Sequence, residues 1–182
     1  AGFSLRRLAS EMDAVFTCLP MPDDVKRVYL DGDGLIASAR PGIVFIDCST
    51  VSPELSRILA ERCAEAGAEF LDAPVSGGTT GAAAGTLSMM VGGRSETLER
   101  AKPLLEPLCS QIFHAGGHGS GSAVKLINQL MVGIHSQAAA EALALGASAG
   151  IDLRNLFDVL NKSFAQSRIL ERHFTQFIEK DD

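Results

Sequence analysis

The sequence lacks the features that mark disulfide-bonded, zinc-binding or membrane-spanning proteins. None of its four cysteines forms a CxxC pair, and they stand at Cys18, Cys48, Cys63 and Cys109. Free thiols in a reducing compartment explain this spacing better than a disulfide framework or a metal site. No apolar stretch is long enough to cross a bilayer, and the first residues lack the apolar core of a signal peptide. We therefore expect a cytoplasmic protein without a membrane partner.

Clustered positive charge is also absent. Lys and Arg number 16 against 22 Asp and Glu, which gives a formal net charge of −6. Proteins bind nucleic acid by neutralising phosphates with grouped basic side chains, so nucleic acid is not an expected partner. The length of 182 residues and the 46% hydrophobic content suit one large or two small globular domains. Because the chain opens at Ala1 without Met, we expect it to be a fragment of a longer protein.

Strand and helix patterns alternate through the first two thirds of the chain. Short apolar segments predict five strands, over residues 14–19, 43–47, 69–75, 87–91 and 111–114. The first two are continuous apolar runs, which are typical of parallel strands covered on both faces. Helical patterns lie between the strands, over 23–39, 53–67 and 95–108. This alternation predicts an incomplete doubly wound, Rossmann-type sheet with mostly parallel strands.

After about residue 118 the pattern is helical only. Residues 121–150 read as one long helix rich in Ala and Leu, with Gly150 as its stop. Asp152 can cap a helix over 153–163, and a last helix covers 167–180. We therefore predict an α/β domain over 1–118 and the beginning of an all-helical domain over 119–182.

The stretch DAPVSGGTTG, residues 72–81, offers a site for an anion. A strand runs into a loop of small residues, and open α/β sheets bind ligands at the carboxyl ends of their strands. Gly77 and Gly78 let the backbone approach a ligand and turn its N–H groups toward a carboxylate, while Ser76 adds a hydroxyl donor. The alternative is a plain tight turn without a ligand, and composition alone favours that alternative.

The stretch GGHGSGSAVKLINQ, residues 116–129, places a lysine one turn inside a helix. Asn128 and Gln129 follow Lys125 by three and four residues, so all three share a helix face. If that helix is buried, desolvation lowers the lysine pKa toward neutrality, which suits proton transfer. The alternative is a solvated helix lysine, which is what most lone lysines are.

These stretches together resemble the β-hydroxyacid dehydrogenase family, which includes the 3-hydroxyisobutyrate, tartronate semialdehyde and threonate enzymes and, as a distant relative, 6-phosphogluconate dehydrogenase. The resemblance rests on DAPVSGG, then GTLSMMVGG at 85–93, then GxGxxxKxxN at 119–128. CLPMPDDV at 18–25 and FIDCSTVSP at 45–53 are similar to two further segments of the family. Ordered motifs at matching intervals are far more specific than any one of them, and they favour function over the plainer interpretations.

The resemblance implies an oxidoreductase that transfers a hydride between NAD or NADP and a small 3-hydroxy acid. It implies that Lys125 is the general acid and base, and that Ser76, Gly77 and Gly78 hold the substrate carboxylate. Asn128 would orient the substrate or Lys125. Many members carry a second Asn where this sequence has Gln129, so the division of work between the two amides stays open.

On the cofactor side, the resemblance implies that Leu19 and Pro20 line the groove and that Thr50 lies near the nicotinamide. Residues 1–118 would then be a partial NAD(P)-binding domain, because the family's opening strands and GxGxxG loop do not occur in the sequence. Lys180 does not match the family's later cofactor-contacting lysine. The substrate would bind between the two domains, and the full-length protein would form a homodimer or homotetramer.

Other polar residues are weaker candidates. Asp72 and Asp47 end strands, and Asp72 fits a residue that caps a loop by accepting backbone N–H bonds better than a catalytic acid. His114 and His118 are separated by Gly116 and Gly117, so they share no helix face and predict no metal site.

Two other classes of function remain open at this stage. One is a catalytically silent fragment or scaffold that oligomerises through its helices, because the phosphate loop is missing. The other is a carboxylate-binding module without redox chemistry, for which the glycine loop alone would suffice.

Overall fold

A computed structural model describes residues 4–178, apart from the side chain of Phe177. Contacts between residues divide the chain into two compact units, Ala1–Leu126 and Ile127–Asp182. Each unit is described by itself.

The first unit is built on a six-stranded sheet. Its strands are β1 (Ala14–Thr17), β2 (Val44–Asp47), β3 (Glu69–Asp72), β4 (Val75–Ser76), β5 (Leu87–Gly92) and β6 (Cys109–Gly116). β1, β2 and β3 are parallel and in register, and β5 and β6 are parallel to each other. β5 pairs antiparallel with β3 through one residue pair and with β4 through two. The prediction of a mostly parallel sheet is therefore confirmed.

Helices surround this sheet. They are α1 (Leu5–Glu11), α2 (Pro22–Leu30), the 3₁₀ turn η1 (Ile36–Ser38), α3 (Pro53–Glu65), α4 (Gly78–Ala84) and α5 (Ser95–Leu105). α3 starts where local chemistry favours a helix, because the Ser52 hydroxyl accepts a hydrogen bond from the Leu55 amide and Pro53 occupies the first helical position. Gly67 follows its end with a φ of 73°.

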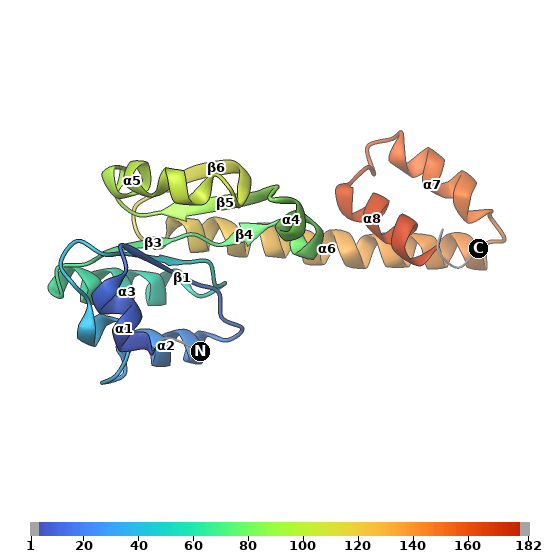
Figure 1. Cartoon of the computed structure of the whole chain (residues 1–182). Coiled ribbons are helices and arrows are strands. Elements are labelled where there is room, and N and C mark those ends of the chain that lie inside the picture. Colours follow the sequence, from blue (N-terminus) through green and yellow to red (C-terminus); the bar gives the residue numbers. More distant parts are fainter. Residues whose placement is uncertain (1–3, 179–182) are drawn as a thin grey trace. The chain divides into compact units, whose positions relative to one another are not determined.

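Two hydrophobic cores cover opposite faces of the sheet. On one face, Phe45 of β2 and Phe70 of β3 pack with residues of α1, α2 and α3. On the other, Ile46 and Leu71 pack with residues of β5 and α5. Neighbouring residues of a strand thus enter different cores, as the two-residue period of a strand requires. Figure 1 shows the same division, with α1, α2 and α3 on one side of the strands and α5 on the other.

The second unit is helical. α6 (Ser120–Ser148) begins in the first unit and continues into the second, where α7 (Leu153–Asn161) and α8 (Arg168–Phe177) follow. The Asp152 side chain caps α7 by accepting a hydrogen bond from the Asn155 amide, as the sequence predicts. The rings of Phe157 and Phe174 stack with their centroids 4.1 Å apart. Among residues 4–178, no helix is both long and apolar enough to cross a membrane.

Some boundaries differ from the sequence prediction. The helix expected over 23–39 ends at Leu30, and the chain turns before η1. A side chain at Gly34 would meet the Tyr29 carbonyl oxygen at 2.9 Å, so the turn there is too tight for any residue but glycine. The strand expected over 69–75 is broken between Asp72 and Val75, which lets β4 pair separately with β5.

Other differences lie at helices. α1 and α4 were not predicted, because α1 is short and α4 consists of Gly, Thr and Ala in a stretch that reads as a loop. The helix over 95–108 ends at Leu105, three residues early. The end of the helix expected over 167–180, with Lys180, lies outside the described residues.

Candidate active site

The carboxylate of Asp72 holds the start of α6. Its Oδ1 accepts a hydrogen bond from the Gly119 amide at 2.8 Å, and its Oδ2 accepts one from the Ser122 amide at 2.9 Å. The first amides of a helix have no partner within the helix, so a carboxylate there satisfies them and complements the helix dipole. Burial raises the pKa of Asp72, and these two hydrogen bonds oppose that rise. Asp72 accepts backbone N–H bonds as predicted, but they cap a helix rather than its own loop.

Glycines allow α6 to approach the sheet closely. A side chain at Gly121 would meet the Met90 carbonyl oxygen at 2.3 Å and the Asp72 carbonyl oxygen at 2.6 Å. A side chain at Gly92 would meet the Asp72 carboxylate at 2.5 Å. The Ser122 hydroxyl also lies 2.9 Å from the Ser56 hydroxyl of α3. The first turn of α6 is therefore fixed against β3, β5 and α3.

Lys125 lies on the next turn of α6 and is buried, with 8% of its surface exposed. Burial lowers the pKa of its ammonium group, because removal from water disfavours the charged form. This environment excludes the alternative of a solvated helix lysine. The lysine belongs to the first unit.

Asn128 and Gln129 lie further along α6, past the division between the units at Leu126 and Ile127. The Asn128 amide nitrogen donates to the Gln129 side-chain oxygen at 3.3 Å. Asn128 is half-buried and Gln129 is exposed. Since both follow Lys125 within about one turn, they keep the predicted helical relation to it.

Ser76, Gly77 and Gly78 form the turn between β4 and α4. Gly77 has a φ of 134° and Gly78 a φ of 63°, which side chains rarely tolerate. A side chain at Gly77 would also meet Leu87 at 3.0 Å. Ser76 is half-buried and both glycines are exposed, so the backbone of the turn is open to a ligand. Asp72, four residues earlier, ties the same segment to the start of α6.

Leu19, Pro20 and Thr50 follow the carboxyl ends of β1 and β2. Leu19 is half-buried, and Pro20 and Thr50 are exposed. The two loops are joined because the Leu19 amide donates to the Ser49 hydroxyl at 2.9 Å. Parallel sheets bind ligands outside the carboxyl ends of their strands, which is where these three residues lie.

The structure thus gathers most of the predicted residues on one unit, in two groups. Asp72 connects the Ser76 turn with the helix of Lys125, and Ser49 connects Leu19 with Thr50. Sequence reasoning missed Ser49 and the pair Ser56 and Ser122. Ser49 stands in the FIDCSTVSP motif, so its place in that motif was the available signal.

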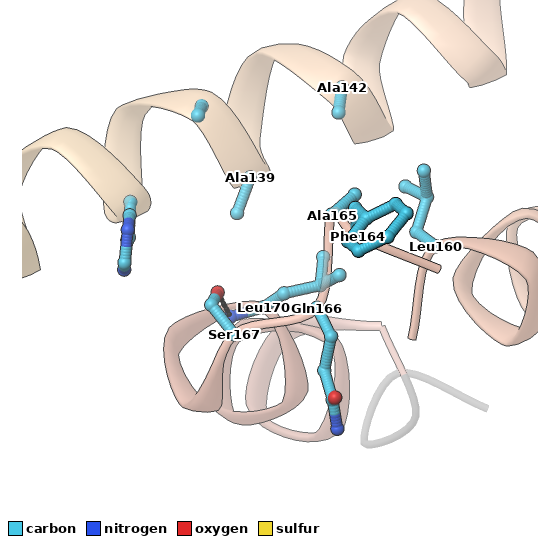
Figure 2. Close-up of a pocket in the computed structure, with 10 residues that line it drawn as sticks. Ala139, Ala142, Leu160, Phe164, Ala165, Gln166, Ser167 and Leu170 are labelled. Atoms are coloured by element: carbon cyan, nitrogen blue, oxygen red, sulfur yellow. Dashed lines mark hydrogen bonds between the residues drawn. The ribbon is translucent and has the colours of Figure 1, made fainter. Parts of the chain in front are cut away.

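A separate pocket lies within the helical unit (Figure 2). Its volume is about 290 Å³, and its walls come from α6, from α7 and α8, and from the segment between α7 and α8. The lining residues include none of those predicted from the sequence: His135, Ala138, Ala139, Ala142, Leu160, Phe164, Ala165, Gln166, Ser167 and Leu170. The Ser167 hydroxyl already accepts a hydrogen bond from the Leu170 amide, so the pocket is mainly apolar. Its chemistry does not match that of the predicted site.

Metal-ligating side chains do not gather in the described part of the chain. Among residues 4–178 there is no group of three His, Cys, Asp or Glu side chains arranged to hold an ion. His114 instead has its ring Nε2 2.9 Å from the Gly93 carbonyl oxygen.

A mostly parallel sheet with helices on both faces defines a Rossmann-type fold, which is typical of nucleotide-binding proteins. The chain belongs to the family of 6-phosphogluconate dehydrogenase NAD-binding domains, whose family model matches residues 1–117. A second model, described as the NAD-binding domain of NADP-dependent 3-hydroxyisobutyrate dehydrogenase, matches residues 119–182.

Individual relatives agree with the family. A NAD-dependent L-serine dehydrogenase of Pseudomonas aeruginosa is 42% identical over 94% of this chain and 57% of its own length. A 3-hydroxyisobutyrate dehydrogenase of the same organism is 46% identical over 83% of this chain and 51% of its own. The structure of Mycobacterium tuberculosis 3-hydroxyisobutyrate dehydrogenase with L-serine is similar at a TM-score of 0.84 and 40% identity, covering 91% of this chain and 56% of that one. The chain therefore spans somewhat more than half the length of these proteins.

The close approach of α6 generates a stability prediction. We expect Gly121→Ala to lower the free energy of unfolding by roughly 1–3 kcal/mol, because the added methyl group meets carbonyl oxygens that belong to strands. Gly133→Ala is the matched control on the same helix, where no atom lies within 4 Å of the added carbon. That variant should be neutral or stabilised by up to about 1 kcal/mol through helix propensity. Urea unfolding of both variants measures the difference, and equal effects would contradict the tight packing.

The buried ammonium generates a prediction about pH. The lowered pKa means that charging Lys125 is harder in the folded than in the unfolded protein. We expect Lys125→Met to raise the free energy of unfolding, most strongly below the lowered pKa. The gain should shrink as pH rises from that pKa toward the ordinary value of 10.5.

Urea unfolding at pH 7 and pH 10 measures this gain. Lys26→Met is the control, because the Lys26 side chain is exposed beside Asp23 and its replacement removes no buried charge. A Lys125→Met protein that gains no more at pH 7 than at pH 10 would show that the ammonium carries no desolvation cost.

Proposed function

We propose that this protein is an NAD(P)-dependent dehydrogenase of small 3-hydroxy acids and that Lys125 is its general acid and base. The observation that carries the proposal is a buried lysine with a lowered pKa, held at the start of a helix that Asp72 ties to the glycine turn. The names of the relatives support the reaction class, since they are dehydrogenases of L-serine and 3-hydroxyisobutyrate.

In this proposal, each residue acts by its own chemistry. The exposed backbone of Gly77 and Gly78 and the Ser76 hydroxyl bind the substrate carboxylate, and so fix the hydroxyl-bearing carbon. Lys125 in its uncharged form accepts the hydroxyl proton, and in the reverse direction its ammonium form returns that proton. Asn128, with Gln129 beside it, orients the substrate or the amine through its amide.

Leu19, Pro20 and Thr50 would hold the nicotinamide end of the cofactor. NAD or NADP, when bound, supplies the hydride acceptor for oxidation and the hydride donor for reduction. The apolar atoms of Leu19 and Pro20 exclude water beside the reacting carbon, and the Thr50 hydroxyl offers a hydrogen bond.

The candidate substrates share one pattern, a carboxylate two bonds from a carbon that carries a hydroxyl. 3-Hydroxyisobutyrate, L-serine, glycerate and threonate all have it. A panel of these acids with each cofactor, assayed by absorbance at the nicotinamide wavelength on the protein at its full natural length, tests the proposal directly. Failure to oxidise any of them with either cofactor would sink it.

We also propose the domain boundary near residue 118, a cytoplasmic location and a homo-oligomeric state. The boundary is supported by the change from strands to helices after β6. The location is supported by four free cysteines, two of them buried. The oligomer is supported by exposed apolar side chains along α6: Ile127, Leu130, Met131 and Ile134.

Replacement of the lysine should affect turnover. We expect Lys125→Ala to lower kcat by roughly two to four orders of magnitude, because the hydroxyl proton then has no acceptor. Lys102→Ala, which removes a half-buried lysine on α5, is the control and should retain wild-type kcat. Steady-state kinetics on folded protein, checked by circular dichroism, measure the effect, and a Lys125→Ala enzyme within a few-fold of wild type would remove the assignment.

Replacement of the serine should affect substrate binding instead. We expect Ser76→Ala to raise KM for the hydroxy acid by about fivefold or somewhat more, because a charged carboxylate loses one hydrogen-bond donor. The kcat should change less, since the donor contacts the carboxylate and not the reacting carbon. Ser88→Ala, on the paired residue of β5, is the control. An unchanged KM in Ser76→Ala would count against this role.

A further inference from the structure

One oxygen of Asp47 collects three hydrogen bonds at the carboxyl end of β2. Its Oδ1 accepts from the Thr17 hydroxyl at 2.8 Å, from the Ser49 hydroxyl at 2.6 Å and from the Ser49 amide at 3.2 Å. The residue is 1% exposed, and among residues 4–178 its Oδ2 is buried with no hydrogen-bond partner. A buried carboxylate oxygen without a partner costs stability, so the fold alone gives little reason to keep an acid here.

Two chains of hydrogen bonds, an inner arm and an outer arm, meet at Oδ1 of Asp47. The inner arm runs through Thr17 to the hydroxyl of Tyr29, 2.8 Å away and fully buried. The outer arm runs through Ser49, whose oxygen accepts a hydrogen bond from the Leu19 amide at 2.9 Å. Ser49 has one hydroxyl proton. Because that proton points to Asp47, the oxygen lone pairs are left to face the Leu19 amide.

The outer arm therefore sets the backbone of the segment that carries Leu19 and Pro20. It also joins that segment to Ser49, which directly precedes Thr50. A hydroxyl without Asp47 could rotate and donate elsewhere, and the link to Leu19 would then weaken. Burial raises the pKa of Asp47, while hydrogen bonds from Ser49 and Thr17 oppose the rise.

We propose that Asp47, acting through Ser49, is a positioning residue that holds the Leu19–Pro20 segment ready for the nicotinamide cofactor. The inference rests on the proposed function, because it takes that segment to be the cofactor edge. It gives a structural reason why the Leu19–Pro20 segment keeps one backbone conformation. It also assigns the two arms different roles, because the inner arm only stabilises the core.

The two arms provide a matched pair of variants. Ser49→Ala removes the link to Leu19, whereas Thr17→Val removes a hydrogen bond to the same Asp47 oxygen and leaves the Leu19 link intact. Both variants should lower the free energy of unfolding in urea. Only Ser49→Ala should weaken cofactor binding, by roughly 3- to 10-fold in Kd, the equivalent of one lost hydrogen bond.

The readout is the Kd of NADH and of NADPH, measured by fluorescence titration on the protein at its full natural length. At saturating cofactor, Ser49→Ala should keep kcat within about twofold of wild type, because Lys125 is untouched. Asp47→Asn keeps an acceptor oxygen and should retain a Kd within a few-fold of wild type. If Ser49→Ala folds poorly, Ser49→Cys replaces it as the test. Cysteine keeps the volume but is a weaker acceptor, so this variant should shift Kd in the same direction as Ser49→Ala.

Three outcomes overturn the inference. If wild type binds the cofactor tightly and Ser49→Ala binds it with the same Kd, this inference is overturned and the proposed function is not. An equal loss of affinity in Thr17→Val and Ser49→Ala would show that the network acts only through stability. Absence of NADH and NADPH binding by wild type would overturn the proposed function and this inference together.

Discussion

The capping of α6 by the Asp72 carboxylate is the interaction on which the rest of the site depends. It joins a strand end to a helix start by two hydrogen bonds in a buried environment. Asp72 ends β3 and the Ser76 turn lies four residues further along, so one side chain connects the segment that leads to this turn with the helix of Lys125. The glycine at 121 completes the arrangement, since the helix can be capped at this depth only if no side chain stands between it and the strands.

A second carboxylate lies beside the first. Asp47 and Asp72 are paired in register on neighbouring parallel strands, and both are buried. Asp72 accepts hydrogen bonds from two amides at the start of α6, and Oδ1 of Asp47 accepts hydrogen bonds from Thr17 of β1 and from Ser49. The common edge of the sheet is therefore organised by two acids with separate tasks, one directed toward α6 and the other toward the loops after β1 and β2. Neither needs to exchange a proton for this purpose.

Much of this arrangement follows from sequence patterns. The alternation of strands and helices, the long helix and the cap at Asp152 are local signals, and the structure confirms them. The break after Asp72 and the helix α4 depend on the pairing of β4 with β5, a contact between residues far apart in the chain, so local composition did not reveal them. Burial of Lys125 depends equally on tertiary packing. From the residues alone we could predict only that a buried Lys125 would suit proton transfer, and the family resemblance supplied the expectation that it has this role.

α6 is one continuous helix, so it fixes the spacing between Lys125 and Asn128. A helix advances about 1.5 Å per residue, so Asn128 sits roughly 4.5 Å beyond Lys125 along the axis. The amine belongs to the first unit and the amide to the second, yet no loop separates them. Hydrogen-bonded helical backbone therefore sets the axial spacing of these two residues directly. Their spacing along the axis is fixed as soon as the helix forms, without help from any loop.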